Sequence, residues 1–112
     1  MQASLGDLDR RLQAAARWAV GVAEAYGIPV TITSVRRSRR KQAALRRAWI
    51  EGRSPWPANR PGESAHEWGL AWDSTVPSWA TAWWAYVRRL AGFRVPNRDI
   101  IHAEAPDWRR WR

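Results

Sequence analysis

Cysteine is absent from the 112 residues of this chain, and histidine occurs only twice, as His66 and His102. The absence of cysteine excludes disulfide bonds and thiolate metal ligands. Any bound metal must therefore be held by histidine, aspartate or glutamate.

Long apolar runs are also absent: none approaches the roughly 18 residues that span a bilayer. Residues 1–11 carry Asp7, Asp9 and two arginines where a signal peptide would need an apolar core. We therefore expect no transmembrane segment and no signal peptide, and synthesis in the cytoplasm.

Basic residues outnumber acidic ones by 19 to 10, which gives a net charge of +9. This charge predicts attraction to polyanions such as nucleic acid, teichoic acid, anionic lipid or lipopolysaccharide. The hydrophobic fraction of 46% and the ten tryptophans predict a packed core, with most tryptophans inside it. The length fits one domain, residues 1–112, and we expect a monomer.

Three segments have the signals of helices. The first follows a possible N-cap at Ser4 and ends at Gly27, the second runs from Ser38 to about Trp49, and the third runs from Pro77 to Gly92. Apolar residues recur at helical spacing in the first and third: Leu5, Leu8, Leu12, Ala15, Ala19, Val22 and Tyr26, and then Trp79, Trp83, Tyr86 and Leu90.

Three short apolar or β-branched segments, Val30–Thr33, Leu70–Thr75 and Ile100–Ala103, read as strands. The segment 53–63 contains three prolines and reads as a loop. The alternation of helices and strands predicts an α+β fold with a small, mostly antiparallel sheet and flanking helices.

A catalytic zinc site needs three protein ligands and a carboxylate that takes a proton from the attacking water. His66, Asp73 and His102 can supply the ligands, since a metal partner removes the energetic penalty of Asp73 on an apolar strand. Asp99 lies three residues before His102, so it must sit in a turn to reach the same site. The alternative for Asp99 is a turn residue that caps its own backbone.

The stretch Ser64-x-His66-x-x-Gly69-x-Ala71-x-Asp73 resembles the S-x-H-x-x-G-x-A-x-D signature of the D-alanyl-D-alanine carboxypeptidase family of zinc peptidases. This family, with the Hedgehog/DD-peptidase fold, includes VanY-type carboxypeptidases and phage L-alanyl-D-glutamate endolysins.

Two further segments resemble the same family. Residues 34–38, followed by Gln42 and Leu45, are similar to its S-G-Y-R-S-x-x-x-Q-x-x-L segment, although Val35 and Arg36 depart from it. The segment Asp99-x-x-His102-x-Glu104 is similar to the endolysin branch, since carboxypeptidases more often have glutamate at the position of Asp99.

The resemblance implies one zinc ion on His66, Asp73 and His102. It implies Asp99 as general base and Arg37 as the group that binds a substrate carboxylate or stabilises the oxyanion. Further residues are predicted to assist: Ser64, Gln42 and Trp68 in substrate binding, and Glu104 in orienting a zinc ligand or in an exposed salt bridge.

The function implied is a hydrolase of peptidoglycan stem peptides, an endolysin-type L-alanyl-D-glutamate endopeptidase or alternatively a D-alanyl-D-alanine carboxypeptidase. Such an enzyme would act on the wall or in the periplasm after release from a bacterial or phage-infected cell. A rival from another class is a basic nucleic-acid- or envelope-binding module without catalysis.

Two aromatic features carry additional expectations. Trp68 and Trp72 flank the zinc motif and are expected to wall the substrate cleft. The basic tail, residues 106–112, is expected to be exposed and to help binding to anionic envelope surfaces, or else to be a disordered basic end.

Overall fold

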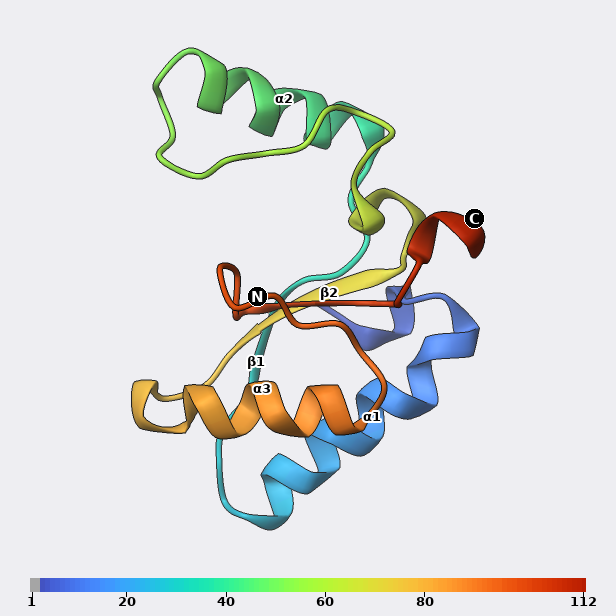
Figure 1. Cartoon of the computed structure of the whole chain (residues 1–112), viewed down its shortest axis with the longest axis vertical. Coiled ribbons are helices and arrows are strands. Elements are labelled where there is room, and N and C mark those ends of the chain that lie inside the picture. Colours follow the sequence, from blue (N-terminus) through green and yellow to red (C-terminus); the bar gives the residue numbers. More distant parts are fainter. Residues whose placement is uncertain (1–2) are drawn as a thin grey trace.

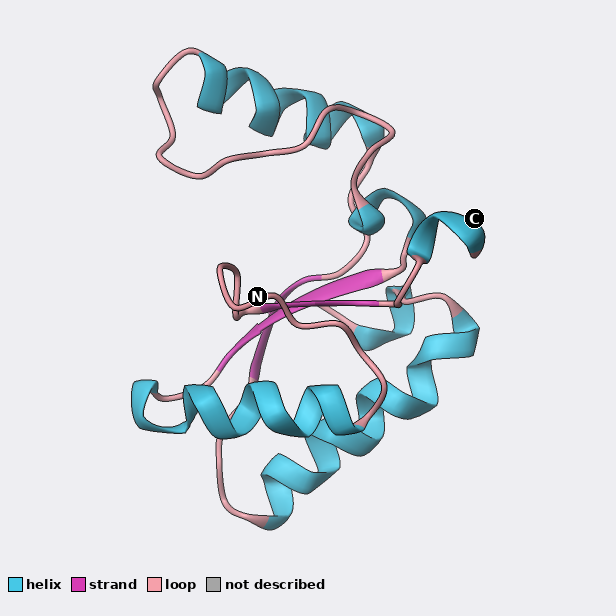
Figure 2. Cartoon of the chain, viewed as in Figure 1, coloured by secondary structure: helices cyan, strands magenta, loops and turns pink. Residues whose placement is uncertain are grey.

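The structure, a computed structural model, describes residues 3–112; Met1 and Gln2 of the predicted domain lie outside the described part. Its longer elements follow the order α1, β1, α2, β2, α3, β3, which confirms the α+β prediction (Figures 1 and 2). The helices are α1 (Arg10–Ala25), α2 (Arg39–Ile50) and α3 (Thr81–Leu90); the strands are β1 (Thr31–Ser34), β2 (Ala71–Thr75) and β3 (His102–Glu104). Short 3-10 turns are η1 (Leu5–Asp7), η2 (Ala65–Trp68), η3 (Ser78–Ala80) and η4 (Trp108–Arg110).

The sheet has the order β1-β2-β3, and both pairings are antiparallel, as predicted. The central strand places Asp73 directly opposite His102 on β3 and opposite Ser34 on β1. The sheet therefore brings together residues from three separate parts of the sequence.

Helices α1 and α3 lie together on one side of the sheet, whereas α2 and the loop after it project away from the rest of the molecule (Figure 1). The core between the sheet and α3 is aromatic. Trp72 of β2 packs edge-to-face on Trp84 and on Phe93, with ring centroids 6.0 and 5.5 Å apart. This packing makes the sheet and α3 one rigid support for the residues on β2 and β3.

The buried face of α3 differs from the predicted one. Of the predicted stripe, Trp79 is 76% exposed, Tyr86 and Leu90 are exposed, and Trp83 is half-buried against the core. The buried residues of the helix are Trp84, Ala85, Val87 and Arg88. The reason is that α3 begins only at Thr81, after η3, and that the indole N–H of Trp84 donates to Ser74 Oγ at 2.8 Å. That hydrogen bond turns the face containing Trp84 toward the sheet.

The two ends of the chain also differ from expectation. Ser4 caps the 3-10 turn η1, and Asp9 is the N-cap of α1, which starts later than predicted. The tail is folded rather than exposed throughout, because Trp108 is buried in the core and the guanidinium of Arg11 donates to the carbonyl of Trp111 at 2.8 Å. The expectation of an exposed or disordered tail is therefore wrong for its two tryptophans.

Within residues 3–112, every helix is too short or too polar to cross a lipid bilayer.

Candidate metal centre

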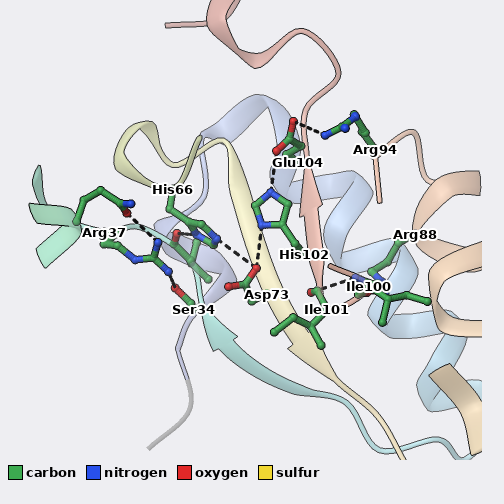
Figure 3. A network of polar contacts seen from close by, with 12 residues as sticks. Ser34, Arg37, His66, Asp73, Arg88, Arg94, Ile100, Ile101, His102 and Glu104 are labelled. Atoms are coloured by element: carbon green, nitrogen blue, oxygen red, sulfur yellow. Dashed lines mark hydrogen bonds and ion pairs between the residues drawn. The ribbon is translucent and has the colours of Figure 1, made fainter. Parts of the chain in front are cut away.

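Three potential metal ligands converge on one side of the sheet. His66 belongs to the turn η2, Asp73 to β2 and His102 to β3 (Figure 3). Their ligand atoms all lie within 4.8 Å of one another. The pairing of β2 with β3 brings His102 next to Asp73, and the sharp turn before β2 brings His66 to the same place.

That turn depends on Gly69, whose φ of +68° is in the left-handed region. A Cβ atom at this position would lie 2.6 Å from the guanidinium of Arg36 and 3.1 Å from the carbonyl oxygen of Asp7. Only glycine therefore fits the conformation that folds His66 back over β2.

Each histidine is oriented by an acceptor on the side away from Asp73. His66 Nδ1 lies 2.6 Å from the carbonyl oxygen of Val35, and His102 Nε2 lies 2.7 Å from Glu104 Oε1. The remaining nitrogens, His66 Nε2 and His102 Nδ1, lie 3.2 and 3.0 Å from the same oxygen, Asp73 Oδ1. If the outer nitrogens donate, the inner nitrogens have lone pairs, which suits a shared cation.

The pKa shifts of the cluster describe a second arrangement, in which the imidazoles donate to Asp73 and which a bound cation would replace. Burial disfavours the charged form of Asp73, but hydrogen bonds from His102 and His66 outweigh burial and hold its pKa well below the usual range. Burial also opposes a charge on His102, yet its hydrogen bonds with Asp73 and Glu104 raise its pKa to about 9. The site therefore favours a negative carboxylate with positive charge beside it.

Glu104 connects the cluster to the surface. Besides its contact with His102, it forms an ion pair with Arg94 at 3.2 Å. Glu104 therefore contacts both His102, which the role of orienting a zinc ligand requires, and Arg94 in a salt bridge. Burial raises the pKa of Glu104, but the hydrogen bond with His102 and the charge of Arg94 lower it further than burial raises it.

Asp99 lies in the turn before β3, as its spacing from His102 requires. Its carbonyl oxygen accepts from the backbone N–H of His102 at 2.9 Å, and its own N–H donates to the carbonyl of Pro96 at 3.1 Å. Its carboxylate is exposed and makes no hydrogen bond or short ion pair with the described residues. Asp99 thus has a free carboxylate on the segment that carries His102.

Arg88 holds this segment in place, and the sequence analysis did not identify it. It is 0% exposed, and its guanidinium donates to the carbonyl oxygens of Ile100, Ile101 and Trp84 (Figure 3). A cation in the last turn of a helix ordinarily indicates only a favourable helix-dipole interaction. The carbonyl of Ile101 also accepts from the backbone N–H of Ser74 at 3.0 Å, so both Arg88 and β2 hold the segment that leads into β3.

Arg37 lies beside the cluster, on the side opposite Glu104 (Figure 3). It donates to Gln42 Oε1 at 2.9 Å and to Ser34 Oγ at 3.3 Å, and it has no carboxylate within ion-pair distance. Burial lowers its pKa, while Asp73 and Glu67 act in the opposite sense. Arg37 is therefore a held guanidinium whose charge has no direct partner.

The other residues predicted to bind substrate have different surroundings. Gln42 is buried behind Arg37, and its amide donates to the carbonyl of Asn59 at 2.8 Å. Ser64 is buried, and its backbone N–H donates to Glu67, a carboxylate that the sequence analysis missed. Because both side chains are buried, they are placed to position neighbouring residues and not to contact a substrate directly.

The two tryptophans that flank the motif differ in their surroundings. Trp68 lines a hollow of about 350 Å³ beside Arg37, with Arg36, Ser38, Arg39 and Glu67 as the other lining residues. Trp72 is fully buried in the core, so the expectation that it walls a cleft is wrong. The reason is the alternation of β2, which points Trp72 to the face opposite Asp73.

Several solved structures that resemble this chain are peptidases. VanYB in complex with D-alanine-D-alanine superposes with a TM-score of 0.75 at 19% identity, over 98% of this chain and 78% of that chain. The fold is that of the VanY-type peptidases. This finding matches the group that the sequence motifs resemble and confirms the predicted fold.

Two further structures have the same VanY-type fold. A vancomycin-resistance D,D-pentapeptidase VanY in complex with Zn(II) has a TM-score of 0.71 at 20% identity and covers 94% of this chain and 76% of its own. The L-Ala D-Glu endopeptidase ChiX of Serratia marcescens has a TM-score of 0.70 at 21% identity and covers 96% of this chain and 86% of its own. No family model and no curated protein matches the sequence.

Proposed function

We propose that this chain is a zinc-dependent peptidase that hydrolyses peptide bonds of bacterial peptidoglycan. The observation that carries the proposal is the convergence of His66, Asp73 and His102 within 4.8 Å in a VanY-type fold. The Zn(II) in a VanY structure and the D-alanine-D-alanine in another support the metal and the substrate class.

The donor set fits zinc. Two imidazoles and one carboxylate are a common catalytic set, and both imidazoles have outer acceptors that orient them. When bound, zinc supplies Lewis acidity and a water whose pKa is lowered to about 7. His66 Nε2, His102 Nδ1 and a carboxylate oxygen of Asp73 would hold it.

Asp99 is proposed as the general base. Its exposed carboxylate has no competing hydrogen bond, and its segment is tied down by Arg88. It would accept the proton from the attacking water and pass it to the leaving amine.

Arg37 is proposed to bind a carboxylate of the substrate or the developing oxyanion. Its guanidinium is fixed by Ser34 and Gln42, so little conformational freedom is lost on binding. In this proposal Gln42 and Ser64 act mainly by positioning, while Trp68 contacts substrate in the hollow beside Arg37.

Among the bonds of the stem peptide we favour L-Ala–D-Glu. The segment with Asp99 resembles the endolysin branch, and ChiX, an L-Ala D-Glu endopeptidase, has the same fold. A D-Ala–D-Ala carboxypeptidase is the second candidate, because VanYB was solved with D-alanine-D-alanine. Action on the wall after release from the cell belongs to the same proposal.

The test is digestion of purified muropeptides, with the products identified by mass spectrometry, with and without a chelator. We expect the wild type to release products of L-Ala–D-Glu cleavage, the chelator to stop the reaction, and Asp99→Asn to lose most activity while retaining zinc. Loss of terminal D-Ala would favour the carboxypeptidase. Chelator-insensitive cleavage would reject the zinc mechanism, and a chain that purifies without stoichiometric zinc would favour a non-catalytic binding module.

A further inference from the structure

The positive charge of this molecule is concentrated in one projecting segment. Residues 39–60, here called the basic arm, comprise α2 and most of the following loop. The arm contains seven basic residues and one acidic residue, so it carries +6 of the net +9 and leaves +3 for the other 90 residues. The figures show it standing away from the sheet and from α1 and α3 (Figure 1).

The arm is preformed. Gln42 is the only buried residue of α2, and its amide donates to the carbonyl of Asn59 at 2.8 Å. Arg46 donates to the carbonyl of Ala58 at 3.0 Å, so the loop is pinned back against the helix. A ligand of the arm would therefore find its basic side chains already arranged, which reduces the entropy lost on binding.

Most of the arm's basic side chains are not used in the fold. Arg40, Lys41 and Arg47 are exposed and make no side-chain hydrogen bond or ion pair with the described residues. Three of the arm's positive charges also lie in the first turn of α2, where the helix dipole disfavours them. Such charge is unfavourable for the fold alone, which points to an external anion.

Large apolar side chains stand at the far end of the same arm. Ile50 is 65% exposed, Trp56 is 77% exposed, and Trp49 is also exposed beside the guanidinium of Arg46, which lies 5.2 Å from its ring. Trp with Arg is the combination that suits the boundary between lipid headgroups and acyl chains. A soluble phosphate polymer could neutralise the charge but would leave the isoleucine in water.

We propose that the basic arm docks on the surface of an anionic lipid bilayer. Its basic residues contact the phosphate headgroups, while Trp49, Ile50 and Trp56 insert among the upper acyl groups. Because the arm begins two residues after Arg37, docking would also set the height of the candidate metal centre above the bilayer. This moves the envelope-binding role from the tail, where Trp108 is buried, to α2 and its loop.

The test is co-sedimentation with vesicles of phosphatidylcholine, with and without phosphatidylglycerol, in the presence of a chelator. Binding is read without catalysis, so its failure is separate from any failure of the proposed function. We expect binding to vesicles with phosphatidylglycerol, and a decrease of about tenfold or more in two variants. These are Trp49→Ser/Ile50→Ser/Trp56→Ser and Arg40→Gln/Lys41→Gln/Arg47→Gln.

Matched controls change the same kinds of residues in the rest of the molecule. Trp79→Ser removes a tryptophan that is 76% exposed on η3, and Arg10→Gln/Arg17→Gln/Arg110→Gln removes three exposed charges. Both should bind like the wild type, and circular dichroism should show that every variant is folded. Wild-type binding by the arm variants, or loss of binding in Trp79→Ser, would overturn the proposal.

A phosphate polymer is the remaining occupant to exclude. If only the charge variant loses binding, and soluble polyphosphate binds the wild type and the Trp49/Ile50/Trp56 variant equally, the arm recognises phosphate without lipid and the bilayer proposal is wrong.

Discussion

The basic arm and the rest of the molecule, here called the body, both contain arginine, but in different surroundings. In the body, Arg88 is fully buried and Arg37 is half-buried, and both donate to named acceptors. In the arm, Arg40 and Arg47 are exposed and have no such acceptor within the described part of the chain. The same residue type therefore has two roles: an arginine with acceptors supports the body, and an exposed arginine without them remains available to an external ligand.

The largest effect is expected for the cluster that the body supports. Asp73→Ala should weaken zinc binding by more than the roughly 100-fold that loss of a supporting residue causes, because it removes the oxygen that both histidines face. Isothermal titration with zinc measures this. In the wild type, zinc at 100 times its dissociation constant should add about 2.7 kcal/mol to the free energy of unfolding.

The control for this variant is Asp7→Ala, which changes an exposed aspartate whose side chain makes no hydrogen bond or ion pair with residues 3–112. It should bind zinc like the wild type. Equal zinc stabilisation of Asp73→Ala and the wild type would show that the ion binds elsewhere.

The next largest effect concerns Arg88. Arg88→Met should lower the free energy of unfolding by about 3 kcal/mol, because it removes a buried guanidinium that donates to the carbonyl of Ile100 and shares the carbonyl of Ile101 with the N–H of Ser74. Denaturant unfolding measures the loss. Arg98→Met, at an exposed arginine of the same segment, should change stability by less than about 0.5 kcal/mol. Equal losses would mean that burial does not distinguish the two arginines.

Glu104 tests whether a residue that contacts a metal ligand, but does not bind the metal, affects zinc affinity. Glu104→Gln should weaken zinc binding by about 10- to 100-fold, since it removes the negative charge behind His102 and in front of Arg94. Glu63→Gln, at an exposed glutamate, is the control and should leave the affinity unchanged. Unchanged affinity in Glu104→Gln would mean that its contact with His102 has no influence on the metal.

The smallest effect is expected for an exposed ion pair of the body. The hydrogen bond from Arg11 is the main reason why the pKa of Asp9 is lowered to about 2. A lowered folded-state pKa adds stability above the ordinary value near 4 and loses it as the pH falls through about 2. Asp9→Asn keeps an N-cap acceptor, so it should lose less than about 1 kcal/mol at neutral pH.

Thermal unfolding at a series of pH values measures this difference. The gap between wild type and Asp9→Asn should close as the pH falls from 5 to 2, about the range between the two pKa values. A gap that stays constant would assign the effect to capping rather than to charge.

Much of the site could be predicted from the sequence because its motifs resemble those of a known family and because part of its geometry is local. The spacing of His66, Gly69 and Asp73 encodes a left-handed turn and a strand, and the parity of Asp99 and His102 encodes a turn before β3. These features depend on neighbouring residues and on the period of a strand.

What the sequence did not reveal depends on distant contacts. In the sequence Arg88 resembles an ordinary cation at the end of a helix. Its buried position depends on hydrogen bonds to the carbonyls of Ile100 and Ile101, which are distant in sequence. The carbonyl of Val35 that orients His66 is backbone and leaves no trace in residue type. The face of α3 was wrong because spacing defines a stripe but does not say which of two apolar stripes meets the sheet.

Because Asp73 pairs directly with His102, the register of β2 and β3 determines whether the two ligands face the same site. Slippage of β3 by a single residue would turn one of the two side chains to the opposite face and separate the ligands. The connection between them, from Thr75 through α3 to Asp99, can change in length only where it leaves Trp84 on the sheet and Arg88 on the segment before β3. An insertion in one of its loops that keeps those contacts would leave the ligands together, whereas a shift of strand register would separate them.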